Sequence, residues 1–264
     1  QFPARDPDIK KAIRGLFLPE EGDKWGSFDY SSQEPRLLVH FASSLPDSMK
    51  HSVVDTIVDE YNNGDVDLHQ MAADLAGISR KEAKVVNLGI MYGMGVGKLS
   101  NQLDISKDEA KDILELYNDK VPFVKQIATI ASQRATTEGQ IRTILGRRCR
   151  FHLWEPRTFG YNKAMPLAEA EKEYGGLGML RRAFTYKALN KLIQGSAADQ
   201  TKKAMVDCYA ENFTPMLTVH DELCFSVENE EQAKRITEIM ETGLPLNVPT
   251  RVDCEMGDNW GEAG

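Results

Sequence analysis

The stretches with strand character lie far apart in the sequence, and this feature constrains the fold more than any other. Residues 25–32 (WGSFDYSS) mix aromatic and small residues, a pattern typical of a strand leaving a buried sheet. The runs PMLTV and ELCFSV within 215–227 alternate apolar and polar residues on either side of a short turn, which predicts a hairpin. A further strand is predicted near 250–256. The chain should therefore assemble an antiparallel sheet from distant segments.

Most of the remaining chain has helical patterns, with capping residues at several starts and glycines at several ends. Helices are predicted over 34–42, 67–77, 79–93, 107–120, 122–139, 181–211 and 230–242. Residues 140–151 (QIRTILGRRCRF) have the pattern of a hairpin around Gly146. Few strands among many helices, without internal repeats or a linker rich in Pro, Gly or Ser, predict the α+β class.

Composition excludes several classes of protein. The 264 residues are 41% hydrophobic and 27% charged, which is ordinary for a globular chain. No apolar run reaches the length of a membrane span, and the N-terminal residues do not resemble a signal peptide. Cysteines 149, 208, 224 and 254 are scattered without a CxxC pair, which indicates reduced thiols and a cytoplasmic protein.

Charge alone leaves the choice of partner open. The net charge of −8 argues against nucleic acid, because phosphate-binding proteins usually present a basic face. Basic residues nevertheless gather at 147–150, at 181–182 and between 187 and 203, whereas acidic residues gather at 169–173 and 228–231. Each group is also compatible with a solvated helix face.

Carboxylates stand at two of the predicted strand ends. Asp29 ends the first strand, and Asp221 and Glu222 lie at the turn of the later hairpin. Each position alone is more typical of a turn or cap residue. Taken together on adjacent strand ends, such carboxylates are suited to hold two Mg²⁺ ions about 3.5–4 Å apart.

A third set of residues recurs at intervals of four in 80–93 (RKEAKVVNLGIMYG). Arg80, Lys84, Leu88 and Tyr92 would form one stripe on a helix, with two cations followed by an apolar and an aromatic side chain. Such a stripe matches the phosphates, sugar and base of a nucleoside triphosphate. Taken alone, the stripe is more typical of an amphipathic helix whose lysines extend over core-facing Leu and Tyr side chains. Gly89 within this helix indicates a close approach to its backbone.

The order and content of these segments resemble DNA polymerases of the polymerase I type (family A), particularly phage members. Residues 28–38 are similar to motif A of that family, 80–93 to motif B and 217–227 to motif C. The resemblance extends to 190–199 (NKLIQGSAAD) and 252–260 (VDCEMGDNW), and so covers essentially the whole chain.

The resemblance implies a right-hand polymerase fold and template-directed DNA synthesis in replication. The chain would add dNTPs to a primer 3′-OH on primer-template DNA. Residues 1–60 would form the first part of the palm, 61–145 the fingers, and 146–264 the second part of the palm with the end of the fingers.

The resemblance also implies roles for individual residues around two Mg²⁺ ions. Asp29, Asp221 and the Tyr30 carbonyl would bind the metals, with Glu222 beside them. Arg80, His69 and Lys84 would bind the triphosphate, and Lys84 would also give a proton to the leaving pyrophosphate.

Other residues would select the nucleotide or contact DNA. Glu34 would exclude ribonucleotides by filling the space of the 2′-hydroxyl, Leu88 would lie at the sugar, and Tyr92 would stack near the templating base. The implied DNA contacts are Asn190, Gln194, His220 and Arg5.

The sequence departs from the family pattern in three places. Pro35 follows the predicted gate residue Glu34, and Leu88 stands where Phe or Tyr is more frequent. The chain also begins inside the family's palm, so the thumb and any exonuclease domain are expected on an upstream polypeptide, either continuous with this chain or bound as a separate subunit. The apolar residues expected to contact it are Phe2, Ile9, Ile13, Leu16 and Phe17, which could instead pack within this chain.

Three other functions compete with this interpretation. A two-metal nuclease would use Asp29 and Asp221 but has no need of the stripe or of Glu34. In a single-subunit RNA polymerase, a glutamate that excludes ribonucleotides would be counterproductive. A catalytically weak DNA-binding remnant would not need to retain Lys84 and Arg80 together with the carboxylates.

Overall fold

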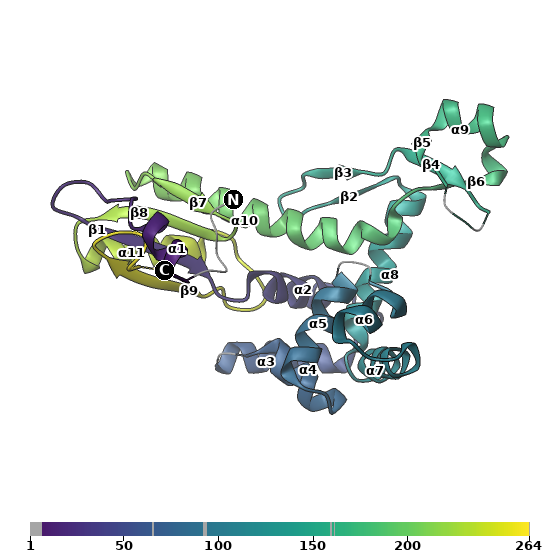
Figure 1. The fold of residues 1–264 in the computed structure, drawn as a ribbon, viewed down its shortest axis with the longest axis horizontal. Helices are drawn as coiled ribbons and strands as arrows, with labels where there is room; N and C mark the ends of the chain where they lie inside the picture. The colour runs from purple at the N-terminus through teal and green to yellow at the C-terminus, as the bar shows by residue number, and fades with distance from the viewer. Residues whose placement is uncertain (1–6, 65, 92–93, 159, 161, 264) are drawn as a thin grey trace. The chain divides into compact units, whose positions relative to one another are not determined.

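The structure is a computed structural model that describes residues 7–64, 66–91, 94–158, 160 and 162–263 (Figure 1). It contains two compact units, residues 1–37 with 197–264 and residues 38–196, and each is described by itself below. Helices and antiparallel strands are mixed in the chain, which confirms the predicted α+β class. The domain boundaries predicted near residues 60 and 145 stay predictions.

The first unit is built on a four-stranded sheet whose neighbouring strands are all antiparallel. Its order is β7 (Leu217–Val219), β8 (Glu222–Val227), β1 (Lys24–Tyr30) and β9 (Val252–Gly257). Figure 1 shows β8, β1 and β9 side by side although they come from opposite ends of the chain. The prediction of a sheet assembled from distant segments is therefore confirmed.

One face of this sheet forms the main core of the first unit. Phe28 and Phe225 meet edge to face with their ring centroids 5.5 Å apart, and both are fully buried. Residues of α11 (Glu230–Thr242) and the second half of α10 (Ala188–Ala210) pack against them, among them Ile236 and Cys208. Burying each large apolar side chain contributes about 1.5–3 kcal/mol, so this face anchors the sheet.

The opposite face carries a smaller aromatic cluster. The Trp25 and Trp260 rings stack with centroids 6.2 Å apart, and Phe17 meets Trp260 edge to face at 5.4 Å. Phe17 follows α1 (Pro7–Arg14) and packs within the first unit. Of the two possibilities that the sequence left open for Phe17, the structure shows packing within this chain. Successive residues of β1 alternate between the two faces, so Asp29 shares the face of Trp25.

The second unit is largely helical. Its helices are α3 (Ser52–Asn63), α4 (Leu68–Ala76), α5 (Arg80–Met91), α6 (Val96–Leu103), α7 (Lys107–Lys120), α8 (Pro122–Thr137) and α9 (Leu167–Tyr174). Helix α2 (Gln33–Ser43) and α10 each run through a boundary between the units.

Short strands and turns complete the second unit. Strands β2 (Gln140–Arg142) and β3 (Arg148–Arg150) form the hairpin predicted around Gly146. A small sheet that the sequence did not predict has the order β5 (Met165–Pro166), β4 (Leu153–Pro156) and β6 (Leu180–Arg182). Two 3₁₀ turns, η1 (Leu177–Met179) and η2 (Thr185–Lys187), flank β6.

Local capping chemistry sets several helix ends. Ser106 and Glu109 form a reciprocal capping box at the start of α7, as their spacing predicts. Asp67 accepts hydrogen bonds from the His69 and Gln70 amides and so caps α4. Within the described part of the chain, no helix is long and apolar enough to cross a lipid bilayer.

Candidate active site

Three acidic residues lie in one row across the sheet of the first unit. Asp29 on β1 stands directly opposite Glu222 on β8 and directly opposite Asp253 on β9. Residues opposite one another in antiparallel strands have Cβ atoms about 4.5–5.5 Å apart on the same face. The register therefore brings Asp29 and Glu222 together as predicted, and adds Asp253, which the sequence analysis did not identify.

A tight turn places Asp221 beside this row. Val219 of β7 pairs with Glu222 of β8, so His220 and Asp221 form a two-residue loop. His220 has a φ of 57°, in the left-handed region that hairpin loops of this length require. A non-glycine residue in that region costs about 1–3 kcal/mol, which the surrounding sheet must offset. The loop thus holds an aspartate at the end of the hairpin at some cost in stability.

The electrostatics of the row favour a bound cation. Burial, followed by the nearby charges of Asp221, Glu222 and Asp253, raises the pKa of Asp29 from 3.8 to about 6, while the Tyr30 backbone amide acts in the opposite direction. Burial also raises the pKa of Asp221, and Glu222 adds to this effect. A cation near Asp29 and Asp221 would relieve the unfavourable interaction between the carboxylates.

The donor set also fits a hard divalent cation. Mg²⁺ is commonly bound through one or two carboxylates, with water and substrate phosphates completing its coordination. Within the described residues, no group of three or more His, Cys, Asp and Glu side chains is arranged to hold a metal ion by itself. Asp29 and Asp221 would provide the one or two protein carboxylates that Mg²⁺ requires when water and substrate phosphates supply its other ligands.

Glu222 is held by its neighbours on the aromatic face. Its Oε1 accepts a hydrogen bond from Trp260 Nε1 at 3.0 Å and from the Cys224 thiol at 3.4 Å. Tyr30 points to the other face, where its hydroxyl donates to the Met240 carbonyl at 3.1 Å. The Tyr30 side chain is thus buried in the core, so the predicted metal-binding role can involve only its main-chain carbonyl.

Glu34 lies in the first turn of α2, and its neighbours fix that turn. Gln33 Nε2 donates to the Ala197 carbonyl and to Thr201 Oγ1 at 3.3 and 3.2 Å. Arg36 is buried and donates through Nε to the Ser31 carbonyl at 2.9 Å. Pro35 is accommodated here because an N–H is not needed in the first turn of a helix. The half-buried Glu34 therefore projects from a well-anchored turn.

A separate cationic cluster forms on α4 and α5 of the second unit. Arg80 donates through Nε to Asp67 Oδ2 at 2.7 Å, and this carboxylate also caps α4. Burial lowers the pKa of His69, and the charges of Lys84 and Arg80 lower it further, whereas Asp67 opposes them. The structure therefore brings His69, Arg80 and Lys84 together as predicted.

The rest of the α5 stripe is only partly described. Leu88 is half-buried, four residues after the exposed Lys84, whereas Tyr92 lies outside the described residues, as does Arg5. The close approach predicted at Gly89 comes from this chain itself. A Cβ on Gly89 would lie 2.6 Å from the Met94 methyl group, so Met94 accounts for the glycine.

Two of the residues that the resemblance assigns to DNA contacts, Asn190 and Gln194, lie on α10 beside basic side chains. Asn190 is half-buried, and Gln194 is exposed one turn later. Arg147 donates through Nη2 to the Gly195 carbonyl at 2.7 Å, and the Lys191 ammonium lies 5.8 Å from the Phe151 ring centroid. Despite the net charge of −8, this part of the second unit is locally basic.

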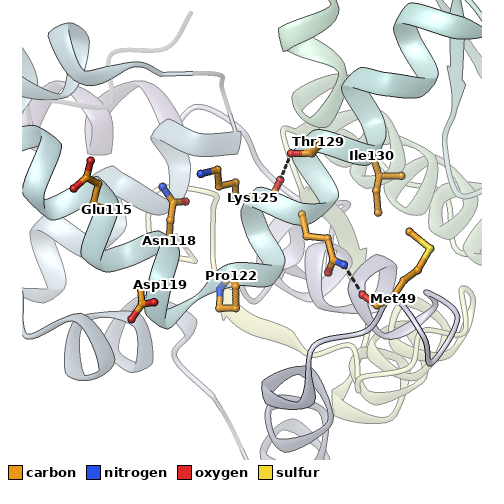
Figure 2. Close-up of a pocket in the computed structure, with 9 residues that line it drawn as sticks. Met49, Glu115, Asn118, Asp119, Pro122, Lys125, Thr129 and Ile130 are labelled. Carbon is orange, nitrogen blue, oxygen red and sulfur yellow. Dashed lines mark hydrogen bonds between the residues drawn. The ribbon is translucent and has the colours of Figure 1, made fainter.

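A cavity of about 670 Å³ in the second unit contains none of the predicted site residues (Figure 2). It lies between α7 and α8, with Glu115 and Asp119 on one side and Lys125 on the other. Gln126 donates to the Met49 carbonyl, and Thr129 Oγ1 donates to the Lys125 carbonyl at 2.9 Å. The first contact joins α8 to the turn that contains Met49, and the second lies within α8. The described residues that line the cavity do not form a convergent set of catalytic groups.

Comparison with known proteins shows the family of the chain. The family model for DNA polymerase family A matches residues 1–262, and the chain belongs to that family. A DNA-directed DNA polymerase of Pseudomonas phage M6 is 36% identical over an alignment covering 100% of this chain and 42% of the phage protein. DNA polymerase I of Rhizobium leguminosarum is 31% identical, with 99% of this chain and 25% of that protein covered.

A solved structure is similar over the whole chain. The POL domain of Pol1 from M. smegmatis, in complex with DNA primer-template and dNTP, superposes with a TM-score of 0.76 at 28% identity. The match covers 100% of this chain and 44% of that one. The chain thus spans less than half the length of these relatives.

Proposed function

We propose that the chain carries out template-directed DNA synthesis, adding deoxynucleotides to a primer 3′-OH. The observation that best supports this proposal is the acidic row in which Asp29 stands opposite Glu222, with Asp221 at the adjoining turn. Membership of family A and likeness to a polymerase domain solved with primer-template and dNTP support the proposal. In this proposal the first unit is the palm, the second contains the fingers, and the protein acts in the cytoplasm of a bacterial host.

The proposed chemistry assigns a separate task to each set of residues. Family A polymerases generally use divalent metals, and we propose that Asp29, Asp221 and the Tyr30 carbonyl hold two Mg²⁺ ions here. When bound, these ions would favour ionisation of the primer 3′-OH and neutralise charge on the transferring phosphate. Arg80 and His69 bind and orient the triphosphate. Lys84 protonates the leaving pyrophosphate oxygen.

The proposal also assigns the residues that hold the DNA and the nucleotide sugar. Asn190, Gln194 and His220 contact the nascent duplex or the primer end, and Leu88 lies against the sugar. Tyr92 would stack near the templating base and Arg5 would contact the primer. The locally basic surface around Arg147 and Lys191 supports binding of a phosphate backbone near Asn190 and Gln194.

Primer extension tests this function directly. A labelled primer-template should be extended by the chain with dNTPs and Mg²⁺, should not be extended when EDTA replaces the metal, and should be extended poorly with ribonucleotides. The same assay separates the alternatives. Degradation of the primer would indicate a nuclease, efficient ribonucleotide incorporation an RNA polymerase, and duplex binding without extension a DNA-binding remnant.

We also propose that an upstream polypeptide bearing a thumb completes the grip on the duplex. Apolar side chains near the start of the described chain face solvent, with Leu16 79%, Leu18 65% and Ile9 47% exposed. The relatives extend well beyond the matched region, which leaves room for such a segment. The net charge of −8 indicates that this chain alone has a weak electrostatic hold on DNA.

This proposal predicts weak DNA binding by the 264-residue chain alone. Adding the polypeptide encoded directly upstream should tighten primer-template binding by about tenfold or more and steepen its salt dependence, because each new phosphate contact adds to the salt slope. Fluorescence anisotropy at several salt concentrations measures both. Leu16→Asp should weaken this gain, whereas Leu116→Asp, at an exposed leucine of α7, should not. Tight binding and processive extension by the chain alone would refute the proposal.

A further inference from the structure

A chain of hydrogen bonds connects three helices of the second unit and ends on His69. Asn87 Nδ2, on α5, lies 2.9 Å from His69 Nδ1, near the start of α4. The hydroxyl of Tyr117, on α7, donates to Asn87 Oδ1. Tyr117 and Asn87 are only 0% and 2% exposed, so both links lie in the interior. Neither residue contains a group that the proposed chemistry uses.

The direction of each hydrogen bond determines the state of the histidine ring. Burial raises the pKa of Tyr117, so its hydroxyl keeps its proton and can donate. With Oδ1 of Asn87 accepting that hydrogen bond, its Nδ2 can only donate to the ring. The Nδ1 atom of His69 must therefore be unprotonated, and the ring proton lies on Nε2.

The surroundings of His69 favour the same neutral ring. Burial lowers its pKa, as do the neighbouring charges of Lys84 and Arg80. Asp67 opposes them, but it also accepts hydrogen bonds from Arg80 and from the α4 backbone. The geometry and the charges together disfavour an imidazolium at this position.

We infer that Asn87 and Tyr117 are positioning residues that hold His69 as a neutral donor, with its Nε2–H directed to the nucleotide triphosphate. This inference rests on the proposed function, which places His69 at the phosphates. A neutral donor of fixed tautomer binds a phosphate oxygen without first taking up a proton. Nucleotide affinity should then be insensitive to pH near neutrality as far as this residue is concerned.

A purely structural role makes different predictions. If Tyr117 and Asn87 only tie α7, α5 and α4 together, their loss would lower thermal stability without any specific effect on the His69 ring. Their burial alone does not separate the two roles, because any buried polar group requires a partner. The tautomer of His69 and its coupling to nucleotide binding do separate them.

Nuclear magnetic resonance on ¹⁵N-histidine protein provides the first readout. The sequence contains five histidines, and the His69 signals are assigned by their loss in His69→Gln. We expect the unmodified chain to show the Nε2–H tautomer at pH 7.5. Tyr117→Phe retains the buried ring but removes the donor, and should produce a mixture of tautomers. Asn87→Asp should raise the pKa of His69 by about one unit or more, because a carboxylate stabilises the charged ring.

Steady-state kinetics of primer extension provides the second readout. Asn87→Leu and Tyr117→Phe should raise KM for dNTP about five- to tenfold, corresponding to one lost hydrogen bond, with kcat changed by less than about twofold. In a His69→Ala background, Asn87→Leu should have no further effect on KM, because its action passes through the ring. Tyr61→Phe, at another fully buried tyrosine of the second unit, is the matched control and should leave both readouts unchanged.

Three results would overturn the inference: a wild-type His69 that is charged or carries its proton on Nδ1, an unchanged tautomer in Tyr117→Phe, or full additivity of Asn87→Leu with His69→Ala. The two readouts also separate this inference from the proposed function. A chain that shows the expected tautomer but cannot extend a primer would refute the polymerase assignment and, with it, the role of the tautomer at a triphosphate. A polymerase with the wrong tautomer would refute the inference alone.

Discussion

Replacing Asp29 or Asp221 with asparagine should abolish nucleotide addition while leaving primer-template affinity within about twofold, since phosphate contacts dominate DNA binding. Asparagine keeps the shape of the side chain but removes the charge that would hold a divalent cation. Losing several kcal/mol of transition-state stabilisation corresponds to a fall in kcat of about a thousandfold or more. Single-turnover primer extension measures the rate, and anisotropy measures the binding. Near-normal extension by either variant would disprove the two-metal assignment.

The same substitution should have a distinct effect on stability in metal-free buffer. The pKa of Asp29 rises from 3.8 to about 6 on folding, so the folded protein binds more protons than the unfolded chain between these pH values. Its contribution to stability is therefore favourable at low pH and is lost as the pH rises from about 4 to 6. Asp29→Asn should flatten that part of the stability curve and raise Tm at pH 7. Asp258→Asn, at an exposed ion pair with Lys24 in the same unit, is the matched control.

Glu34→Ala should admit ribonucleotides, the second largest effect that we expect. Forcing an additional hydroxyl into a filled site costs about 1–3 kcal/mol, so opening the site should reduce the preference for dNTP over rNTP by about 10- to 100-fold. The anchored first turn of α2 makes this a local change, because Gln33 and Arg36 keep their own contacts. Single-turnover rates with each nucleotide measure the selectivity.

A conservative variant separates volume from charge at this gate. Glu34→Gln keeps almost the same volume, so it should retain most of the selectivity if exclusion is steric. Equal loss in Glu34→Gln and Glu34→Ala would indicate that the charge, and not the space it fills, determines selection. Unchanged selectivity in both variants would remove Glu34 from the sugar site.

The sequence predicted those parts of the fold that depend on local chemistry. The capping box of Ser106 and Glu109 and the alternation on both sides of His220 and Asp221 each locate an element from neighbouring residues alone. The helix predicted over 181–211 shows where this approach fails. Leu180–Arg182 pairs with the distant β4, and Phe184 has a φ of 61°, so α10 begins only at Ala188.

The same distinction applies to the candidate site, where some residues are recognised from their sequence neighbours and others only from contacts between distant segments. Asp29 and Asp221 stand out because each ends an apolar strand or lies in its turn. Asp253 lies in an ordinary alternating run, and only the register of β9 against β1 places it opposite Asp29. Similarly, the link from Tyr117 through Asn87 to His69 joins three helices, and the spacing along the sequence contains no signal for it.

The register of the acidic row also determines when it can form during synthesis. Its members stand at positions 29, 222 and 253, so the ribosome must add more than 220 residues after Asp29 before β1 has both of its partner strands. The helical second unit depends mainly on contacts between nearer segments and can fold earlier. Until β9 emerges, β1 exposes an unpaired edge that could pair with another nascent chain. The acidic row can therefore assemble only after β9 has been synthesised, and β1 is exposed to aggregation until then.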